Sequence, residues 1–150
     1  MVKKKNILTY TNIRNFRGFH IPAPVQNLIL REYCANNNLQ FSLPIEEYIF
    51  DNCYIELEGI ISNLKKDNSL LLCSSEILPL EKNYINYLMD KLIYNKCELH
   101  LILDKKILKS KKEYFLFFKE KILNKKIIEI SLNSFIEIKN YLNGNSDYRR

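Results

Sequence analysis

Residues 68–75 read NSLLLCSS, and this stretch decides the fold class of the chain. A continuous apolar run of this kind is typical of a strand that is buried on both faces of a parallel sheet. Apolar residues at helical spacing precede it at 53–66 and follow it at 80–95. Strands that alternate with helices in this way predict a parallel α/β sheet.

The same alternation extends over most of the 150 residues. Further strands are predicted at 6–10, 39–43, 97–103 and 127–131, and further helices at 24–36, 109–125 and 135–143. Ser134 and Glu137 have the spacing of a capping box for the last helix, which Gly144 would end. We therefore predict one α/β domain over residues 1–143, with three layers and a mostly parallel sheet of four to five strands flanked by helices. Residues 144–150 are predicted to be a frayed tail.

The amino-acid composition says less about binding partners than the pattern of strands and helices says about the fold. The chain carries a net charge of +6 and is rich in Ile, Leu, Lys, Asn and Tyr. This profile is typical of an AT-rich genome, so the lysines favour a solvated surface over a nucleic-acid footprint. Glycine-rich nucleotide loops are absent from the sequence, which argues against binding of ATP or a dinucleotide through such loops.

The four cysteines also exclude some classes of site. Cys34, Cys53, Cys73 and Cys97 are about twenty residues apart and lack the spacing of a zinc site, so no metal and no cofactor is predicted. Three of them lie in apolar runs and are expected to be buried free thiols, and Cys53 is the exception. With no signal-peptide pattern and no apolar stretch of membrane-spanning length, we expect a cytoplasmic protein that does not contact a membrane.

Arginine is concentrated in one short stretch of the chain. Arg14, Arg17 and Arg31 lie near the N-terminus, and the other two arginines end the chain. A guanidinium group can bind a carboxylate or phosphate through two parallel hydrogen bonds, whereas lysine acts as a point charge. The N-terminus of the helix at 24–36 adds free N–H groups. These features predict an anion site at the carboxyl edge of the sheet.

Other polar residues are predicted to share that edge. Gln26 and Asn27 open the same helix but point in different directions, so one of the two is expected to reach a ligand. Ser74 and Ser75 end the central strand and either bind substrate or cap the next helix. For the arginines, the alternative is that they only tie loops together by pairing with Glu46, Glu47 or Asp51.

Candidates for catalysis follow the second predicted strand. Glu47 could be a general acid or base if its carboxylate were desolvated, with Tyr48 or Cys53 assisting the proton transfer. His100 lies inside an apolar strand and is read as a core histidine rather than a ligand. No histidine and acid stand at a spacing that suggests a catalytic triad.

Residues 7–14, 25–41 and 56–80 resemble the catalytic domain of serine recombinases, the resolvases and invertases, and this likeness makes the predicted fold resolvase-like. The chemistry of that family is not retained. Tyr10 matches the tyrosine of its Tyr-x-Arg-x-Ser motif, but Asn12 replaces the arginine and Arg14 replaces the nucleophilic serine. Ile77 and Leu80 stand at two later arginine positions. The long oligomerising helix of that family is also not expected here.

The chain is also similar to the sporadic carbohydrate cluster protein family of bacterial surface-glycan loci. The likeness spans about residues 10–105. The residues that carry it are Pro22, Val25, Gln26, Asn27, Leu28, Arg31, Tyr33 and Cys34, then Glu47, Tyr48, Cys53, Tyr54 and Glu56. Ala23 and Asn15 depart from the pattern. The resemblance implies a role in building an unusual sugar and no defined reaction.

Two hypotheses follow. The first is an enzyme or essential accessory protein of surface polysaccharide biosynthesis, acting on a phosphorylated, carboxylated or nucleotide-linked sugar by metal-free isomerase, epimerase or lyase chemistry. It would work as a homodimer and without nucleic acid. The second is a non-catalytic recombinase-like module that binds protein or DNA through the basic helix at 109–126. The clustered arginines and the second resemblance favour the first hypothesis.

Overall fold

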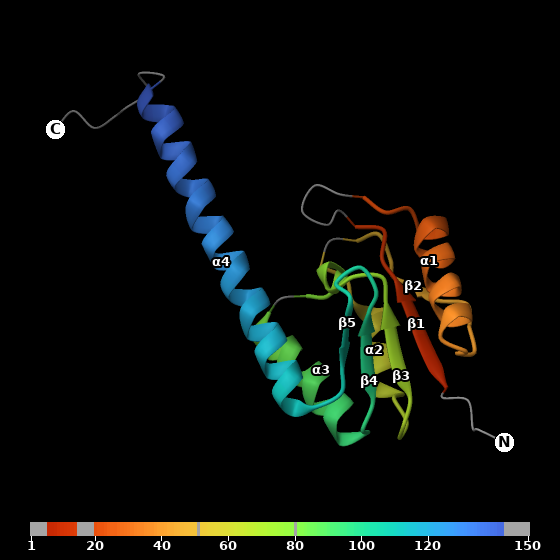
Figure 1. Cartoon of the computed structure of the whole chain (residues 1–150). Coiled ribbons are helices and arrows are strands. Elements are labelled where there is room, and N and C mark those ends of the chain that lie inside the picture. Colours follow the sequence, from red (N-terminus) through yellow and green to blue (C-terminus); the bar gives the residue numbers. More distant parts are fainter. Residues whose placement is uncertain (1–5, 15–19, 51, 80, 143–150) are drawn as a thin grey trace. The chain divides into compact units, whose positions relative to one another are not determined.

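The computed structural model describes residues 6–14, 20–50, 52–79 and 81–142. The chain divides into two compact units, residues 1–114 and 115–150, and each is described by itself. The first unit contains one five-stranded sheet with the strand order β2-β1-β3-β4-β5 (Figure 1). The strands are β1 (Ile7–Thr11), β2 (Ile45–Glu46), β3 (Ser69–Leu72), β4 (Glu98–Leu101) and β5 (Lys106–Leu108).

Four strands are parallel and β5 is antiparallel to β4. Three helices connect the strands of this unit: α1 (Ala23–Asn36), α2 (Ile55–Ser62) and α3 (Lys82–Tyr94), with a short 3-10 helix η1 at Ser75–Ile77. The fourth helix, α4 (Lys111–Leu142), follows β5. The predicted α/β fold with a mostly parallel sheet is confirmed.

Strand β3 lies at the centre of the sheet, as its sequence predicts. All four of its residues are buried, and it pairs with β1 on one side and β4 on the other. Leu71 packs with Ile7 against Leu30 and Cys34 of α1. Because successive side chains of a strand point to opposite faces, Leu70 and Leu72 face the other side, where α2 and α3 lie (Figure 1).

The predicted strand at 39–43 is wrong. The second strand is instead Ile45–Glu46, inside the predicted loop, where it pairs with Tyr10 and Thr11. The preceding segment runs beside β1 but is held by side chains: Thr9 Oγ1 donates to the carbonyl of Ser42 at 3.0 Å, and Ser42 Oγ donates to the carbonyl of Ile7 at 3.1 Å. The apolar residues there pack on the core without forming a ladder.

A hairpin that the sequence analysis missed joins β4 to β5. Lys105 in its turn has a φ of 52°, and Lys96 before β4 has a φ of 53°, so two lysines occupy left-handed backbone. After β5, the hydroxyl of Tyr114 donates to the carbonyls of Cys97 and Leu108, both at 2.9 Å. These bonds fix the first turn of α4 to the hairpin.

Helix α4 is continuous over 32 residues, so the predicted strand at 127–131 is wrong. Its N-terminus has a capping box, but at Ser110 and Glu113. Glu113 Oε2 accepts from the N–H groups of Lys109 and Ser110, and Glu113 N–H donates to Ser110 Oγ. Ser134 is not a cap: its Oγ donates to the carbonyl of Ile130 at 3.0 Å within the helix. One long helix is therefore present where two shorter helices separated by a strand were predicted.

No helix among the described residues is both long enough and apolar enough to cross a membrane.

Candidate functional site at the carboxyl edge of the sheet

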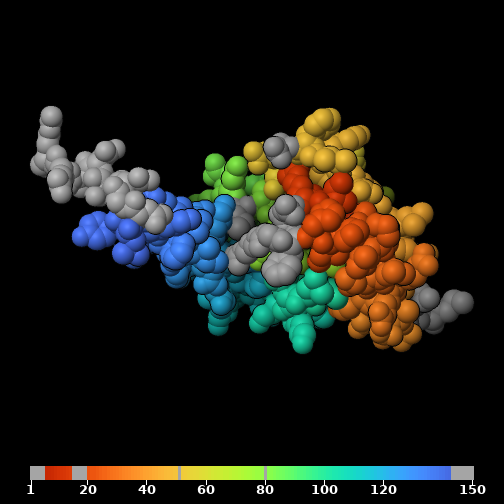
Figure 2. Space-filling view, turned by 90° about the horizontal axis from the view of Figure 1, so that it is seen from above, coloured from red at the N-terminus to blue at the C-terminus, as the bar shows by residue number. Residues whose placement is uncertain are grey.

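The strand order places a topological switch point between β1 and β3, because β2 lies on one side of β1 and β3 on the other. Ligands of open α/β sheets bind outside the carboxyl ends of the strands at such a point. Figure 2 looks down on this edge, where the end of β1 and the start of α1 (red to orange) lie beside the segment around β2 and α2 (yellow). The predicted site residues are therefore described from this edge.

Glu47, the predicted acid or base, follows β2 and is only 2% exposed. Its carboxylate sits at the N-terminus of α2, where backbone N–H groups lack partners within the helix. Both oxygens accept hydrogen bonds. The donors to Oε1 are Tyr48 N (3.1 Å), Glu56 N (3.4 Å) and Cys53 Sγ (3.6 Å), and those to Oε2 are Tyr10 OH (3.1 Å) and Leu57 N (3.2 Å). This is the environment of a carboxylate that joins β2 to α2.

The hydroxyl of Tyr10 completes that arrangement. Burial and the neighbouring Glu47 carboxylate raise the pKa of Tyr10 far above its usual value. The hydroxyl therefore stays protonated and donates to Glu47, while it accepts from Asn12 Nδ2 at 3.2 Å. Asn12 is 1% exposed, and its Oδ1 accepts from the N–H of Arg14 at 3.0 Å. Side chains thus fill the switch point itself.

Arg14 ties two loops together. One guanidinium nitrogen donates to the carbonyl of Phe50 at 2.7 Å and to the carbonyl of Cys53. The guanidinium carbon lies 4.5 Å from the centre of the Tyr54 ring, which allows a cation–π interaction. The alternative of a loop tie fits these contacts, but the partners are carbonyl groups rather than the carboxylates expected.

Gln26 and Asn27 differ in their surroundings. Gln26 is completely buried; its Nε2 donates to the carbonyls of Asn12 (2.7 Å) and Ile21 (2.8 Å), and its Oε1 accepts from Asn12 N (3.4 Å). It therefore fixes the loop after β1 onto α1. Within the described part of the chain, the buried Oδ1 of Asn27 has no hydrogen-bond partner.

The three predicted arginines are not seen to converge. Arg31 lies on α1 with its guanidinium carbon 5.4 Å from the ring of Phe41, in the segment that packs behind β1. Arg17 lies outside the described residues. Tyr48 is 53% exposed and stacks on Phe50, with ring centres 6.4 Å apart. The anion site therefore stays a prediction.

Ser74 and Ser75 have well-defined structural contacts. Ser74 is the N-cap of η1, and its Oγ accepts from Glu76 N at 3.2 Å. Asp104, after β4, accepts from Ser74 Oγ (3.2 Å), Ser75 N (2.7 Å) and Ser75 Oγ (2.7 Å). Ser74 thus caps η1, and substrate binding by Ser74 and Ser75 stays a prediction. Asp104 was not among the predicted site residues, although its position directly after an apolar strand was a usable signal.

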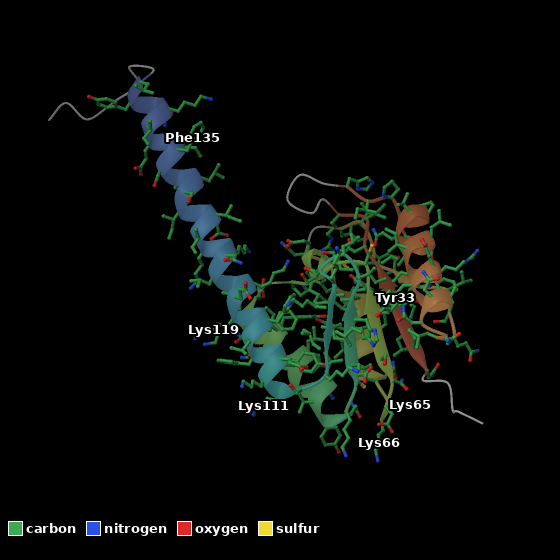
Figure 3. All side chains as sticks on the ribbon, viewed as in Figure 1. Tyr33, Lys65, Lys66, Lys111, Lys119 and Phe135 are labelled. Carbon is green, nitrogen blue, oxygen red and sulfur yellow. The ribbon has the colours of Figure 1, made fainter. Side chains whose placement is uncertain are left out.

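His100 is a satisfied histidine in the core, as predicted. It is 7% exposed, with Nδ1 2.9 Å from the hydroxyl of Tyr33 and Nε2 3.2 Å from Glu98 Oε2. Tyr33, labelled in Figure 3, comes from α1, and its ring meets the imidazole edge-on with ring centres 5.8 Å apart. Glu98 also pairs with Lys109 at 3.4 Å.

The cysteines follow the prediction in their burial. Cys34, Cys73 and Cys97 are buried, and Cys53 is half-buried. Burial, and secondarily Asp104, raises the pKa of Cys73 to about 11, so this thiol stays protonated at neutral pH. No group of three or more His, Cys, Asp and Glu side chains in the described residues could hold a metal ion.

A second candidate surface lies on α4. Lys111, Lys112 and Lys119 are exposed on the side of the helix that also carries Phe115, because each of them lies three or four residues from Phe115. Phe115 is 56% exposed, and Lys119 Nζ lies 5.8 Å from its ring centre. We call these four residues the lysine face. Figure 3 labels Lys111 and Lys119 in the first half of α4 and Phe135 in the second half.

Comparison with known proteins gives limited guidance. No protein-family model matches the chain. Endonuclease MutS2 of Borreliella burgdorferi is 33% identical to it over 103 residues, which cover 65% of this chain and 12% of that protein. The likeness thus concerns a small part of a much longer protein.

Proposed function

We propose that this chain is a non-catalytic α/β module that binds DNA through the lysine face of α4. The observation that carries the proposal is an exposed phenylalanine surrounded by lysines on one helix face. Lysines neutralise phosphates, and an exposed aromatic ring can stack on an unpaired base. The partial similarity to an endonuclease is consistent with a nucleic-acid partner, and its activity is not carried over.

Charge along α4 supports this assignment. Residues 111–126 contain six lysines against two glutamates, whereas residues 127–142 contain one lysine against two glutamates. An AT-rich genome would raise lysine throughout the chain, and it does not explain why the first half of one helix holds so many.

Fluorescence anisotropy with a labelled 20-mer, single-stranded and as a duplex, tests the proposal. The test variant is Lys111→Gln/Lys112→Gln/Lys119→Gln. The matched control removes three exposed lysines that lie outside α4, Lys65, Lys66 and Lys82, in the same way. We expect the test variant to reduce the slope of log affinity against log salt by about 3, because each phosphate contact contributes roughly 1. Equal losses in both variants, or no binding at low salt, would refute the lysine face.

Phe115→Ala separates stacking from charge. Loss of one stacked base should weaken single-strand binding by about 5- to 100-fold, leave the salt slope unchanged and affect the duplex less.

We also propose that two copies pair through the second half of α4. Nine large apolar side chains of this half are between 46% and 75% exposed: Ile127, Ile128, Ile130, Leu132, Phe135, Ile136, Ile138, Tyr141 and Leu142. We call them the apolar face. A helix that is apolar around most of its circumference is normally buried. An antiparallel second copy would bring Glu137 of one chain near Lys125 and Lys126 of the other, and would leave the lysine face open.

The carbohydrate hypothesis remains a second prediction. Among the described residues, Arg14, Gln26 and Glu47 are occupied by protein partners rather than directed together at an open site. A thermal-shift panel of nucleotide sugars, sugar phosphates and 2-keto sugar acids tests it. A shift that Arg31→Lys abolishes would support the anion site, whereas no shift with any compound would leave only the binding module.

A further inference from the structure

The two faces of α4 point to opposite sides of the helix. Successive residues of an α-helix are turned by about 100°, so residues seven apart lie on nearly the same side. Ile128, Phe135 and Leu142 have this spacing and are all exposed, and we call them the seam of the apolar face. Phe115 and Lys119 of the lysine face are each turned by about 160° from Phe135. The labelled Lys119 and Phe135 accordingly point to opposite sides of α4 in Figure 3.

Pairing through the seam therefore turns the two lysine faces away from each other. The seams of the two copies meet, so each lysine face lies on the outside of the pair, whether the helices run parallel or antiparallel. A parallel pair would place the two Lys139 side chains beside each other, which favours the antiparallel pair. Phe115 is about 16 to 20 residues from the centre of an antiparallel pair, which places the two Phe115 positions about 50 to 60 Å apart along the axis.

A lysine face is a short site, and one short duplex cannot reach two of them. Lys111 and Lys119 are about 12 Å apart along the helix axis. A DNA duplex carries one phosphate per about 1.7 Å of its axis, so such a face meets only a few phosphates. A 20-mer duplex is far shorter than the persistence length of about 150 base pairs and behaves as a stiff rod. A rod that lies on one lysine face cannot bend round to the outside of the partner copy.

We propose that the α4 pair bridges two separate DNA segments, with one segment on each lysine face. The inference rests on the proposed DNA binding and on the proposed pairing, and it adds what the two do together. If both lysine faces held the same duplex, linkage would raise the affinity of the pair by about 10²–10⁴ over that of one copy. Bridging gives no such gain on a short duplex, but it joins two DNA molecules. Affinity and joining therefore distinguish the two arrangements.

Bead capture measures the joining. One 20-mer duplex carries biotin and a second duplex of unrelated sequence carries a fluorophore, and each has a short overhang of thymidines so that paired and unpaired DNA are both offered. Streptavidin beads retain the fluorophore only where protein joins the two duplexes. The full chain is titrated from less than one copy to many copies per duplex at about 0.1 M salt. Anisotropy of the fluorescent duplex gives the affinity in the same buffer.

The parent chain should retain the fluorophore along a bell-shaped curve, because excess protein gives each duplex a pair of its own. Ile128→Asp/Phe135→Asp should lower the retained fluorophore at least about tenfold, while its affinity for one duplex stays within about threefold of the control. The control, Asn133→Asp/Asn140→Asp, adds the same charges away from the seam. Asn133 lies about 27 Å along the axis from Phe115, beyond the Debye length of about 10 Å, so the control should bridge like the parent.

Binding without retained fluorophore would overturn bridging and leave the lysine face intact. A loss of about 100-fold or more in the affinity of Ile128→Asp/Phe135→Asp, relative to the control, would mean that the pair grips one duplex and would also overturn bridging. Retention that keeps rising with excess protein indicates aggregation and counts against the proposal in the same way. No binding by the parent chain at low salt would remove the proposed function, and bridging with it.

Discussion

At the carboxyl edge of the sheet polar side chains are buried and paired, whereas in the second half of α4 apolar side chains are exposed. Glu47 is 2% exposed and accepts five hydrogen bonds, while Phe135 is 63% exposed. Each arrangement reverses the usual distribution of polar and apolar groups. A buried polar group that is fully paired has a structural role, whereas an exposed apolar surface indicates a partner.

The largest expected effect concerns Glu47. Glu47→Ala leaves buried donors of β2, α2 and Tyr10 without an acceptor, so we expect a loss of about 3–5 kcal/mol in the free energy of unfolding. Urea denaturation measures it. Its neighbour Glu46 is exposed, and Glu46→Ala should stay within about 0.5 kcal/mol of the parent chain. If the two variants were equally stable, Glu47 would not be what joins β2 to α2, and an acid/base role would regain support.

The next effect concerns the apolar face of α4. Ile128→Asp/Phe135→Asp places two charges on that face, and we expect it to shift the dimer towards monomer by at least about tenfold in dissociation constant, because each unpaired charge would be buried. Sedimentation equilibrium measures the shift. The control, Asn133→Asp/Asn140→Asp, adds the same charges to the polar side of the helix.

If both double variants dissociated to the same extent, charge repulsion between the two copies would explain the dissociation, and disruption of the apolar face would not. A parent chain that is monomeric at all concentrations would refute the pairing itself.

The smallest effect concerns the capping box of α4. Hydrogen bonds from the N–H groups of Lys109, then Ser110, lower the pKa of Glu113. A lowered pKa in the folded state means that the stabilisation is present at neutral pH and is lost as the pH falls through that pKa, below the usual value of about 4.3. Circular dichroism should show slightly less helix in Glu113→Gln than in the parent at pH 7, and no difference at pH 2. Glu120→Gln, further along α4, should match the parent at both values.

The sequence predicted the sheet better than the site. NSLLLCSS is apolar enough to indicate the central strand, and Pro24 marks the start of α1. The segment 127–131 is apolar and short, and periodicity alone cannot distinguish a strand from a buried or partner-bound helix. The pattern Ser-x-x-Glu occurs at Ser110 and at Ser134, and only the first follows a strand end that leaves free N–H groups to be capped.

The residue types of the site were predicted, but not their contacts. Arginine at position 14 indicated a bidentate hydrogen-bonding group, and it binds carbonyl groups of its own chain. Glu47 was expected to be reactive if desolvated, and burial instead came with enough donors to satisfy the carboxylate. These four partners lie nine to 39 residues away along the chain, so their identity depends on the fold more than on local spacing.

The two left-handed lysines have a consequence for stability. Lys96 and Lys105 hold φ values near 50°, a region that costs a residue with a Cβ atom about 1–2 kcal/mol. Glycine would adopt it without that strain but would lose about 0.5–1 kcal/mol of chain entropy on folding. Replacing either lysine by glycine is therefore expected to raise the free energy of unfolding by up to roughly 1 kcal/mol. The protein thus has room for stabilisation at two turns whose residues belong to neither of the faces of α4 that are proposed to bind.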